Sequence, residues 1–194
     1  MTIIRGSKVR GFILAAAFSA GLGFATSAPA QTHSYLVDLN SKTVTELGTL
    51  GGLYSAAYGI NDAGQVVGYS YMAGGAQHAF ITGPDGMGMR DLGTLGGGGD
   101  WSSALGINDA GQVVGYSDTA GGAHAFITGP DGAGMMDLNS LVDVPAGVIL
   151  EQATGINNSG QVIAIAVPEP EIYALFLAGV ALVGFVARRK KGNF

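Results

Sequence analysis

Hydrophobic residues are distributed unevenly along the chain, and their pattern divides it into three parts. An uncharged apolar run covers residues 11–25, and a second one covers residues 172–187. Between them, apolar residues occur only in short groups separated by stretches rich in Gly, Ala, Asp and Ser. Short apolar groups bounded by turn residues predict β-strands, whereas long uncharged runs are typical of segments that enter a membrane. The pattern therefore indicates a β-rich body between two apolar ends.

The middle of the chain is an internal repeat, which suggests a stacked architecture. Three segments of the first unit recur in the second: LGTLGG at 47–52 and 92–97, GINDAGQVVGYS at 59–70 and 106–117, and HAFITGPDG at 78–86 and 124–132. A degenerate third copy follows, with DLNSL at 137–141 and GINNSGQVI at 155–163. The period is 45 to 49 residues, so residues 47–166 hold about two and a half units.

Each repeat unit is expected to form four short strands. The first strand ends in Gly-Ile before the turn at residues 61–64, and Gln-Val-Val-Gly-Tyr-Ser forms the second. Asn at the first turn position and Gly at the fourth suit a type I turn followed by a bulge. His-Ala-Phe-Ile is the third strand, the Gly-Pro-Asp-Gly segment at 83–86 is a second turn, and residues 89–92 begin the fourth strand.

The strands are apolar on both faces. Val66 and Val67 are adjacent and must point to opposite sides of a sheet, as must Phe80 and Ile81. Such sheets need cover on both faces, and a stack of small antiparallel sheets provides it. β-Propeller blades are the common case. We therefore predict an all-β body of propeller-blade-like four-stranded units, too few to close a ring alone, preceded by a lead-in strand within residues 31–46.

The repeats resemble the HAF family of probable extracellular repeats, which takes its name from the triplet His78-Ala79-Phe80 that recurs at residues 124–126. The resemblance covers roughly residues 47–163 and implies a propeller-like fold without implying an activity. This chain has fewer units than the family usually has. An open stack, a fragment of a longer array and a ring completed by association are the alternatives, and each leaves strand edges to be protected.

The first thirty residues are expected to be a signal peptide removed by signal peptidase. Three basic residues precede the apolar run at 11–25, which is shorter than the roughly 20 residues that a membrane span requires. Ala28 and Ala30 form the A-x-A pair of a cleavage site, so we place the cut after Ala30. An uncleaved N-terminal anchor is the alternative.

The C-terminal 28 residues, 167–194, form a second targeting segment with three consecutive parts. These are the motif Val167, Pro168, Glu169 and Pro170, the apolar run at 172–187, and the basic residues Arg188, Arg189, Lys190 and Lys191. The prolines favour an extended backbone, which suits a protease substrate. A helix over the apolar run is slightly short for a membrane, and the basic flank predicts a cytoplasmic end. A plain tail anchor is the alternative.

In this arrangement the tail resembles a PEP-CTERM sorting signal. The resemblance implies processing by an exosortase, a membrane-embedded cysteine protease of Gram-negative bacteria that make exopolysaccharide. Pro168, Glu169 and Pro170 carry the motif, although the bond that is cut does not follow from it. On this interpretation the transmembrane helix at 172–187 holds the protein at the inner membrane until processing delivers it to the cell surface or the extracellular space.

Charge and composition narrow the function classes. Residues 31–166 carry twelve acidic residues against Lys42 and Arg90, a net charge of −10, which is opposite to the clustered cations that nucleic acid requires. The chain has no cysteine, so it has neither a disulfide framework nor a thiol nucleophile. His78 and His124 occupy equivalent repeat positions, which favours a structural histidine bonded to a turn. His33 lies near the expected new N-terminus and is expected to be flexible.

Two binding hypotheses remain open for the repeat body. The spacing of Asp85 and Asp91 places oxygen ligands near one another, as calcium requires, but it lacks the EF-hand spacing and its closing Glu. Trp101 follows a glycine run and either stacks on a sugar ring or fills a gap in the repeat. We expect no catalytic residue and no cofactor, and we leave the metal question open.

These observations predict a non-enzymatic, exported protein of the cell surface, extracellular matrix or biofilm that an exosortase processes. Its repeat body has a structural or adhesive role. The expected partners are exosortase, signal peptidase, the membrane before processing, and exopolysaccharide as a candidate ligand. The alternatives are a glycan- or calcium-binding lectin-like module and, more remotely, a propeller-type polysaccharide-active enzyme.

Overall fold

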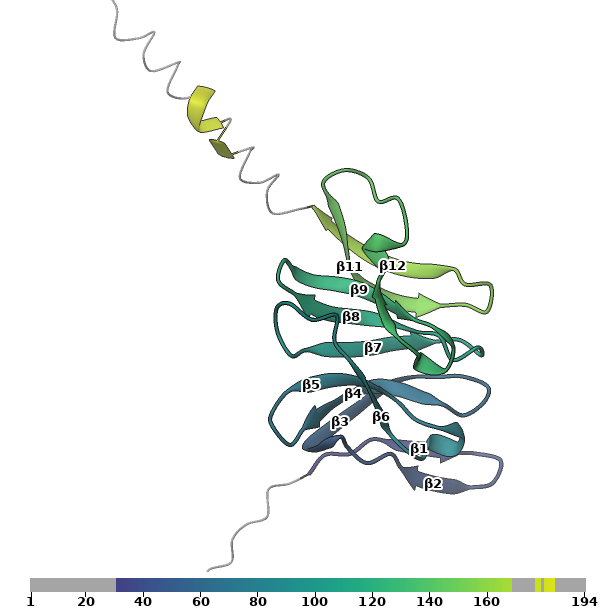
Figure 1. The fold of residues 1–194 in the computed structure, drawn as a ribbon. Coiled ribbons are helices and arrows are strands. Elements are labelled where there is room, and N and C mark those ends of the chain that lie inside the picture. Colours follow the sequence, from purple (N-terminus) through teal and green to yellow (C-terminus); the bar gives the residue numbers. More distant parts are fainter. Residues whose placement is uncertain (1–30, 169–176, 179, 184–194) are drawn as a thin grey trace, which may run out of the picture.

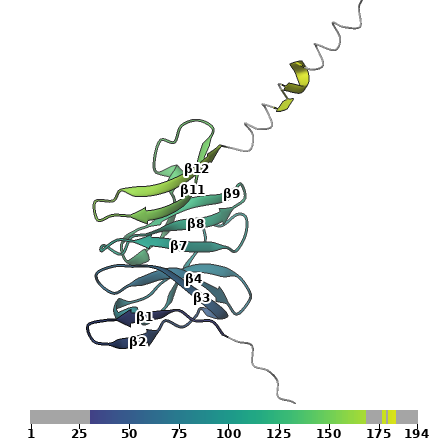
Figure 2. The same cartoon turned by 180° about the vertical axis from the view of Figure 1, so that it is seen from behind.

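A computed structural model of the chain describes residues 31–168, 177–178 and 180–183. The body is a stack of four small antiparallel β-sheets, and none of the sheets within these residues closes on itself (Figure 1). Figure 2 shows the same order of sheets from behind, so the stacking does not depend on the view. The predicted signal peptide and most of the predicted sorting tail lie outside the described residues.

The strands group into sheets in the order of the sequence. The first sheet pairs β1 (Tyr35–Asp38) with β2 (Thr43–Glu46). The second is ordered β3 (Gly51–Ile60), β4 (Val66–Met72), β5 (Gln77–Ile81) and β6 (Arg90–Gly93). The third repeats this order with β7 (Ser102–Ile107), β8 (Val113–Thr119), β9 (Gly122–Thr128) and β10 (Met135–Asp137). The fourth pairs β11 (Val148–Ile156) with β12 (Val162–Pro168), and 3-10 turns lie at Pro84–Gly86, Pro130–Gly132 and Leu138–Ser140.

The two full repeats become the two four-stranded sheets, as predicted. The turn between β3 and β4 has the expected geometry, because the Gly64 amide donates to the Asn61 carbonyl at 3.0 Å and the Asn61 amide donates to the Gln65 carbonyl at 3.2 Å. Gly64 has a φ of 79°, which is the left-handed conformation that the bulge position requires. The same turn recurs at residues 108–111 and 157–160.

Apolar layers fill the three spaces between neighbouring sheets. Val66 and Phe80 pack toward the first sheet, whereas Val67 and Ile81 pack toward the third. Val114 joins a further layer between the third sheet and the β11–β12 pair. The adjacent apolar residues of β4, β5 and β8 therefore serve two different layers, which confirms that the two four-stranded sheets are covered on both faces.

The first sheet differs from expectation. Residues 31–46 were expected to hold one lead-in strand, but they form the hairpin of β1 and β2. This hairpin takes the place of the third and fourth strands of a repeat, because Leu47-Gly-Thr-Leu follows Glu46 of β2 just as Leu92-Gly-Thr-Leu follows Asp91 of β6. The stack therefore begins with half a repeat unit as well as ending with one.

The last strand extends into the predicted sorting tail. β12 includes Val167 and Pro168, which pair with Ile149 and Val148 of β11. Folded structure thus reaches two residues beyond the boundary expected at residue 166. Among the described residues, no helix is long and apolar enough to span a membrane, and most of the predicted span at 172–187 is not described.

Candidate functional sites in the repeat body and the sorting motif

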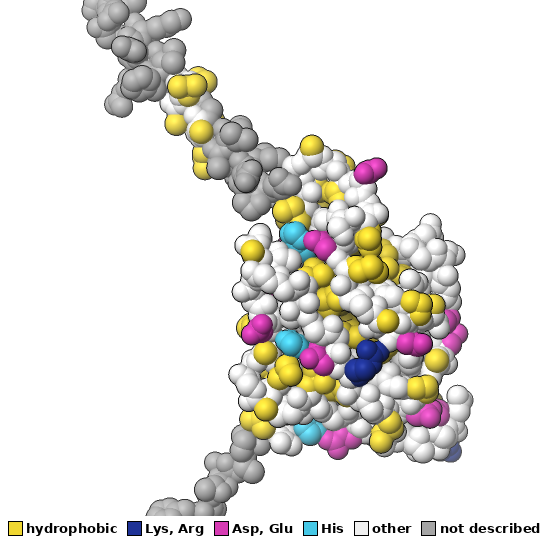
Figure 3. All heavy atoms as spheres, in the orientation of Figure 1, with side chains coloured by type: hydrophobic (Ala, Val, Ile, Leu, Met, Phe, Trp, Pro, Cys, Tyr) yellow, Lys and Arg dark blue, Asp and Glu magenta, His cyan; other side chains and the backbone are white. Residues whose placement is uncertain are grey.

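Each of the three histidines pairs with a carboxylate on the following strand. His78 Nδ1 lies 2.9 Å from both carboxylate oxygens of Asp91, and His124 Nδ1 lies 2.7 Å from Asp137 Oδ2. His33 makes the corresponding contact with Glu46. Histidine and acidic side chains therefore lie side by side at three levels of the stack, in a column on the face that Figure 3 shows.

Local hydrogen bonds hold the carboxylates in place. The backbone amide of Gly93 donates to Asp91 Oδ1 at 2.7 Å, and the Asn139 amide donates to Asp137 Oδ1 at 2.9 Å. Partial burial acts to raise the pKa of Asp137, but hydrogen bonds from His124 and Asn139 outweigh it and lower the pKa below the ordinary value. Asp137 is therefore ionised at neutral pH and accepts a hydrogen bond from His124.

This geometry ties two neighbouring strands together. A carboxylate on Nδ1 fixes the imidazole tautomer and leaves Nε2 as an acceptor, which is also how a catalytic base is oriented. Within the described residues, no hydrogen bond reaches the Nε2 atom of any histidine. His33 was expected to be flexible, but its half-buried side chain takes part in the same pairing.

The histidine–carboxylate pairs were missed in the sequence, although a signal was present. His33–Glu46, His78–Asp91 and His124–Asp137 are each separated by 13 residues. The sequence singled out Asp91 only for its spacing to Asp85. The constant spacing, rather than any motif, was the observation that pairs them.

A second set of polar contacts links successive repeats at the Asn-containing turns. The side-chain amide of Asn61 donates to the Asn108 carbonyl at 3.0 Å, and that of Asn108 donates to the Asn157 carbonyl at 3.2 Å. The Asp62 amide also donates to Asp109 Oδ1 at 3.0 Å. This contact, together with a bond from Asn158, holds the pKa of Asp109 below its ordinary value. The turns therefore form a continuous ladder along the stack.

Four tyrosines gather on β3 and β4. The Tyr69 ring stacks on Tyr54 with centroids 5.8 Å apart and contacts Tyr71 edge-on at 6.2 Å, while Tyr58 lies 5.8 Å from Tyr69 and is exposed. Partial burial raises the pKa of Tyr69, and hydrogen bonding to Tyr54 raises it further. A hollow of about 400 Å³ beside Tyr54 and Tyr71 is floored by the glycines that begin β3. Aromatic rings beside an open hollow are suited to stacking on sugar rings.

The surroundings of Asp91 and of Trp101 bear on the calcium-binding and sugar-stacking hypotheses. Asp91 is engaged with His78, and among the described residues no group of three or more His, Asp or Glu side chains is arranged to hold a metal ion. Trp101 is exposed rather than buried within the repeat. Its exposure is compatible with the sugar-stacking hypothesis, and it lies next to Gln77 of the preceding sheet.

Most of the predicted targeting residues cannot be placed. Of the sorting motif, Val167 and Pro168 lie at the end of β12. The other predicted residues lie outside the described part of the chain: Ala28, Ala30, Glu169, Pro170, Arg188, Arg189, Lys190 and Lys191.

The fold and these contacts define a β-repeat protein made of stacked antiparallel sheets. Comparison with family models adds the nature of its tail: residues 166–191 match the PEP-CTERM protein-sorting motif. The match supports a PEP-CTERM protein, and the motif implies an extracellular protein that is targeted to an exosortase and anchored in the membrane before cleavage. No curated protein matches the chain. The matched segment leaves the repeat body without a family assignment.

Proposed function

We propose that this protein is a non-enzymatic component of the cell surface or extracellular matrix, and that its repeat body has a structural or adhesive role. A signal peptide exports it, the C-terminal segment anchors it, and an exosortase removes that segment. The sorting motif at 166–191 supports export and processing. The repeats are of the HAF type and the body is propeller-like. Exopolysaccharide of the biofilm is the material that surrounds the protein.

One observation carries the structural role. The polar groups of the repeats are used in the same way in successive units, as the Asn61-to-Asn108 and Asn108-to-Asn157 bonds illustrate. The histidine–carboxylate pairs likewise occur at three levels instead of at one distinct site. Side chains that bind their own scaffold at every level favour a stiff extracellular module.

Intact mass of the protein recovered from the producing cell tests the processing. We expect a species that lacks the predicted signal peptide, residues 1–30, and residues 172–194, which hold the predicted transmembrane helix at 172–187 and the basic residues after it. A mature protein that keeps residues 172–194 would show that the tail is a permanent anchor. Recovery from cells without exosortase provides the control, because the full tail should then be retained.

Co-sedimentation with exopolysaccharide purified from the same cells tests the role of the body. We expect the protein to sediment with the polysaccharide and to leave its chain length and number of reducing ends unchanged. New reducing ends would identify a polysaccharide-active enzyme instead. Protein that stays in solution, together with an unchanged matrix in cells lacking the gene, would refute the structural or adhesive role.

The tyrosine group supports a second candidate, a glycan-binding module. Tyr58 is exposed beside Tyr69, and the hollow next to Tyr54 gives a sugar ring space to approach. A glycan array with and without EDTA separates direct stacking from calcium-mediated binding. Tyr58→Ala should weaken binding at least several-fold, whereas Tyr35→Ala, which removes an equally exposed tyrosine from another sheet, should not. Equal effects of the two substitutions would exclude this site.

A further inference from the structure

We propose that two copies of this chain pair head to tail and close into one ring, in which β12 of each copy joins β1 of the other. Each junction makes a four-stranded sheet from the two half repeat units at the ends of the chains. This inference concerns assembly and does not depend on the proposed function.

The N-terminal hairpin is equivalent to the outer half of a full sheet. Three of its contacts with the second sheet recur between β5–β6 and the third sheet. The Thr32 amide donates to the Leu53 carbonyl at 3.0 Å, and the Gln77 amide donates to the Asp100 carbonyl at 3.2 Å. The Ser34 amide donates to the Ser55 hydroxyl, as the Ala79 amide does to the Ser102 hydroxyl. The Ser55 hydroxyl in turn donates to the Gly48 carbonyl, as the Ser102 hydroxyl does to the Gly93 carbonyl. β1 and β2 therefore stand where β5 and β6 stand in a complete unit.

The C-terminal hairpin is equivalent to the inner half. β11 and β12 are joined by the same Asn-to-Gly turn as β3 and β4. The bulge between Ala153 and Gly155 repeats the bulge between Ala57 and Gly59. The described body thus begins with strands three and four of a sheet and ends with strands one and two. The strand pairing that both ends lack is the one between strands two and three, which joins β4 to β5 in the second sheet.

Both half-sheets expose surfaces that are buried in the complete sheets. Ile163 of β12 is 69% exposed, whereas its repeat equivalents Val67 and Val114 are 0% exposed. Tyr35 of β1 is 56% exposed, whereas Phe80 in the equivalent position is 0% exposed. Within the described residues, no strand pairs with the outer edge of β1 or of β12. Unprotected edges of this kind are templates for pairing with another chain.

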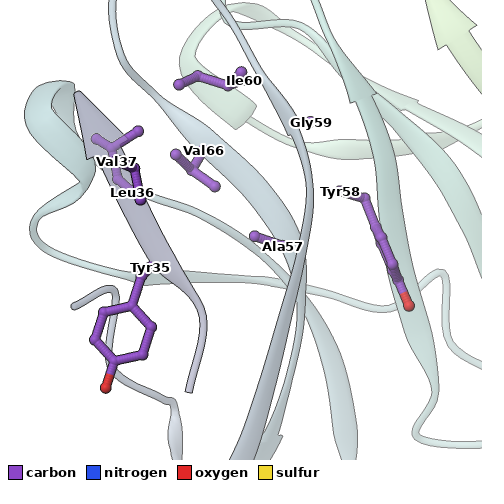
Figure 4. Close-up of a pocket in the computed structure, with 8 residues that line it drawn as sticks. All are labelled: Tyr35, Leu36, Val37, Ala57, Tyr58, Gly59, Ile60 and Val66. Atoms are coloured by element: carbon purple, nitrogen blue, oxygen red, sulfur yellow. The ribbon is translucent and has the colours of Figure 1, made fainter. Parts of the chain in front are cut away.

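A cavity marks the place of the missing strands. A hollow of about 230 Å³ lies between β1 and the inner strands of the second sheet, as Figure 4 shows. Ile60 on its wall is 55% exposed, whereas the equivalent Ile107 is 9% exposed beneath strands β3 to β5. Over Ile60 of the second sheet, β1 of the first sheet supplies only one of the three covering strands. The partner's β11 and β12 would supply the other two.

The turn ladder is open at the same two ends. Asn61 and Asn108 each donate a side-chain bond to the next turn, but Asn157 has no following turn within the described residues. Gly155 is open on the corresponding side, whereas a Cβ on Gly106 would lie 3.0 Å from Gly155 Cα. Continuation of the ladder brings Asn157 to the carbonyl of the partner's Asn61.

The number of copies follows from the number of sheets. In the described part of the chain, two full sheets and two halves amount to three sheets, so closed rings of this body contain three, six or nine sheets. β-Propellers typically have four to eight blades, and only two copies give a number in that range. The two half-sheets of one chain lie at opposite ends of the stack, so they cannot pair with each other (Figure 1).

The repeats also fix the register of the proposed junction. Gly68 pairs with Phe80 between β4 and β5, and Gly115 pairs with Phe126 between β8 and β9. The equivalent pair at the junction is Ala164 of β12 with Tyr35 of the partner's β1. Ile165 is the next residue of β12, and its side chain points to the opposite face of the sheet.

Two measurements on the full chain in detergent test this assembly. Native mass spectrometry of the unaltered protein should give twice the mass of one chain. Oxidation of the double variant Tyr35→Cys with Ala164→Cys should give a covalent dimer on a non-reducing gel, since the natural chain has no cysteine. The matched control is Tyr35→Cys with Ile165→Cys, which should remain monomeric on the same gel.

Each outcome decides the proposal. A dimeric native mass with cross-linking of the first variant alone supports the closed ring and its register. A ladder of trimers and larger species would overturn the ring in favour of an open filament. Equal cross-linking of both variants would overturn the register. A monomeric native mass would overturn the assembly even if the variants failed to fold.

Discussion

The side-chain amide of Asn61 donates a 3.0 Å hydrogen bond to the backbone carbonyl of Asn108, 47 residues further along the chain. Asn108 repeats the contact with Asn157, so one asparagine in each turn reaches the turn of the next repeat. Cohesion between sheets therefore depends on directed polar contacts as well as on the apolar layers.

Asn108→Ala should lower the free energy of unfolding by about 1–3 kcal/mol, because it removes the bond to Asn157 and the two hydrogen bonds that the Asn108 side chain makes with Gln112. Chemical denaturation measures the change. Asn40→Ala is the control, since the Asn40 side chain lies exposed in the β1–β2 turn. Equal effects of the two substitutions would contradict a role for the turn ladder in stability.

Gly68→Ala should destabilise the second sheet by at least about 2–3 kcal/mol. A Cβ at this position would lie 1.9 Å from the Ala56 carbonyl oxygen, so the two paired backbones would have to move apart to accept it. Gly74→Ala is the matched control because a Cβ there meets nothing within 4 Å, so its effect should stay within about 0.5 kcal/mol. Thermal unfolding of the two variants distinguishes a packing role for Gly68 from a general effect of losing glycine.

The pH dependence of stability should include a contribution from Asp137. Its pKa in the folded protein is below the ordinary value, so the unfolded chain binds a proton there more readily. The stabilisation is present above the unfolded pKa of about 4 and is lost as pH falls through the lower, folded pKa. Asp137→Asn should flatten the decline of unfolding free energy below pH 4. The same substitution at the exposed loop residue Asp143 is the control, and equal flattening by both variants would contradict a specific contribution from Asp137.

Alkaline titration of tyrosine absorbance should show a late component from Tyr69. Burial and contact with Tyr54 raise the pKa of this phenol, so it ionises above the ordinary tyrosine pKa of about 10. Tyr69→Phe should remove the latest step of the curve while the repeat body stays folded by circular dichroism. Persistence of that step in the variant would assign it to another tyrosine.

Much of the fold could be predicted because its physical causes are local. Val66 beside Val67 requires cover on both faces of a strand, and Asn61 followed by Gly64 specifies a hairpin turn. The β1–β2 hairpin was missed because His33-Ser34-Tyr35 departs from the His-Ala-Phe triplet by which the repeat was recognised. Only the 13-residue spacing from His33 to Glu46 still marks these residues as part of a repeat.

The candidate sites were harder to predict because their partners are distant in sequence. The ladder bond of Asn61 joins residues that come together only when whole sheets stack. The tyrosine group likewise depends on the register that places Ala56, between Tyr54 and Tyr58, opposite Tyr69. A repeat period predicts that such contacts recur in each unit. It does not predict which side chains pair, because that depends on how the strands and sheets come together.

β12 contains Val167 and Pro168, the first two residues of the sorting motif, and pairs them with β11. The last strand of the folded body therefore ends at the residue immediately before Glu169 in the sequence, so no linker separates the strand from the rest of the motif. A protease that grips the motif as an extended segment must either accept a globular domain at its entrance or pull two residues out of a hairpin. A strand that ends at Pro168 thus restricts how far a protease's groove could extend over the residues before Glu169. Added linker residues before Val167 would relax that limit.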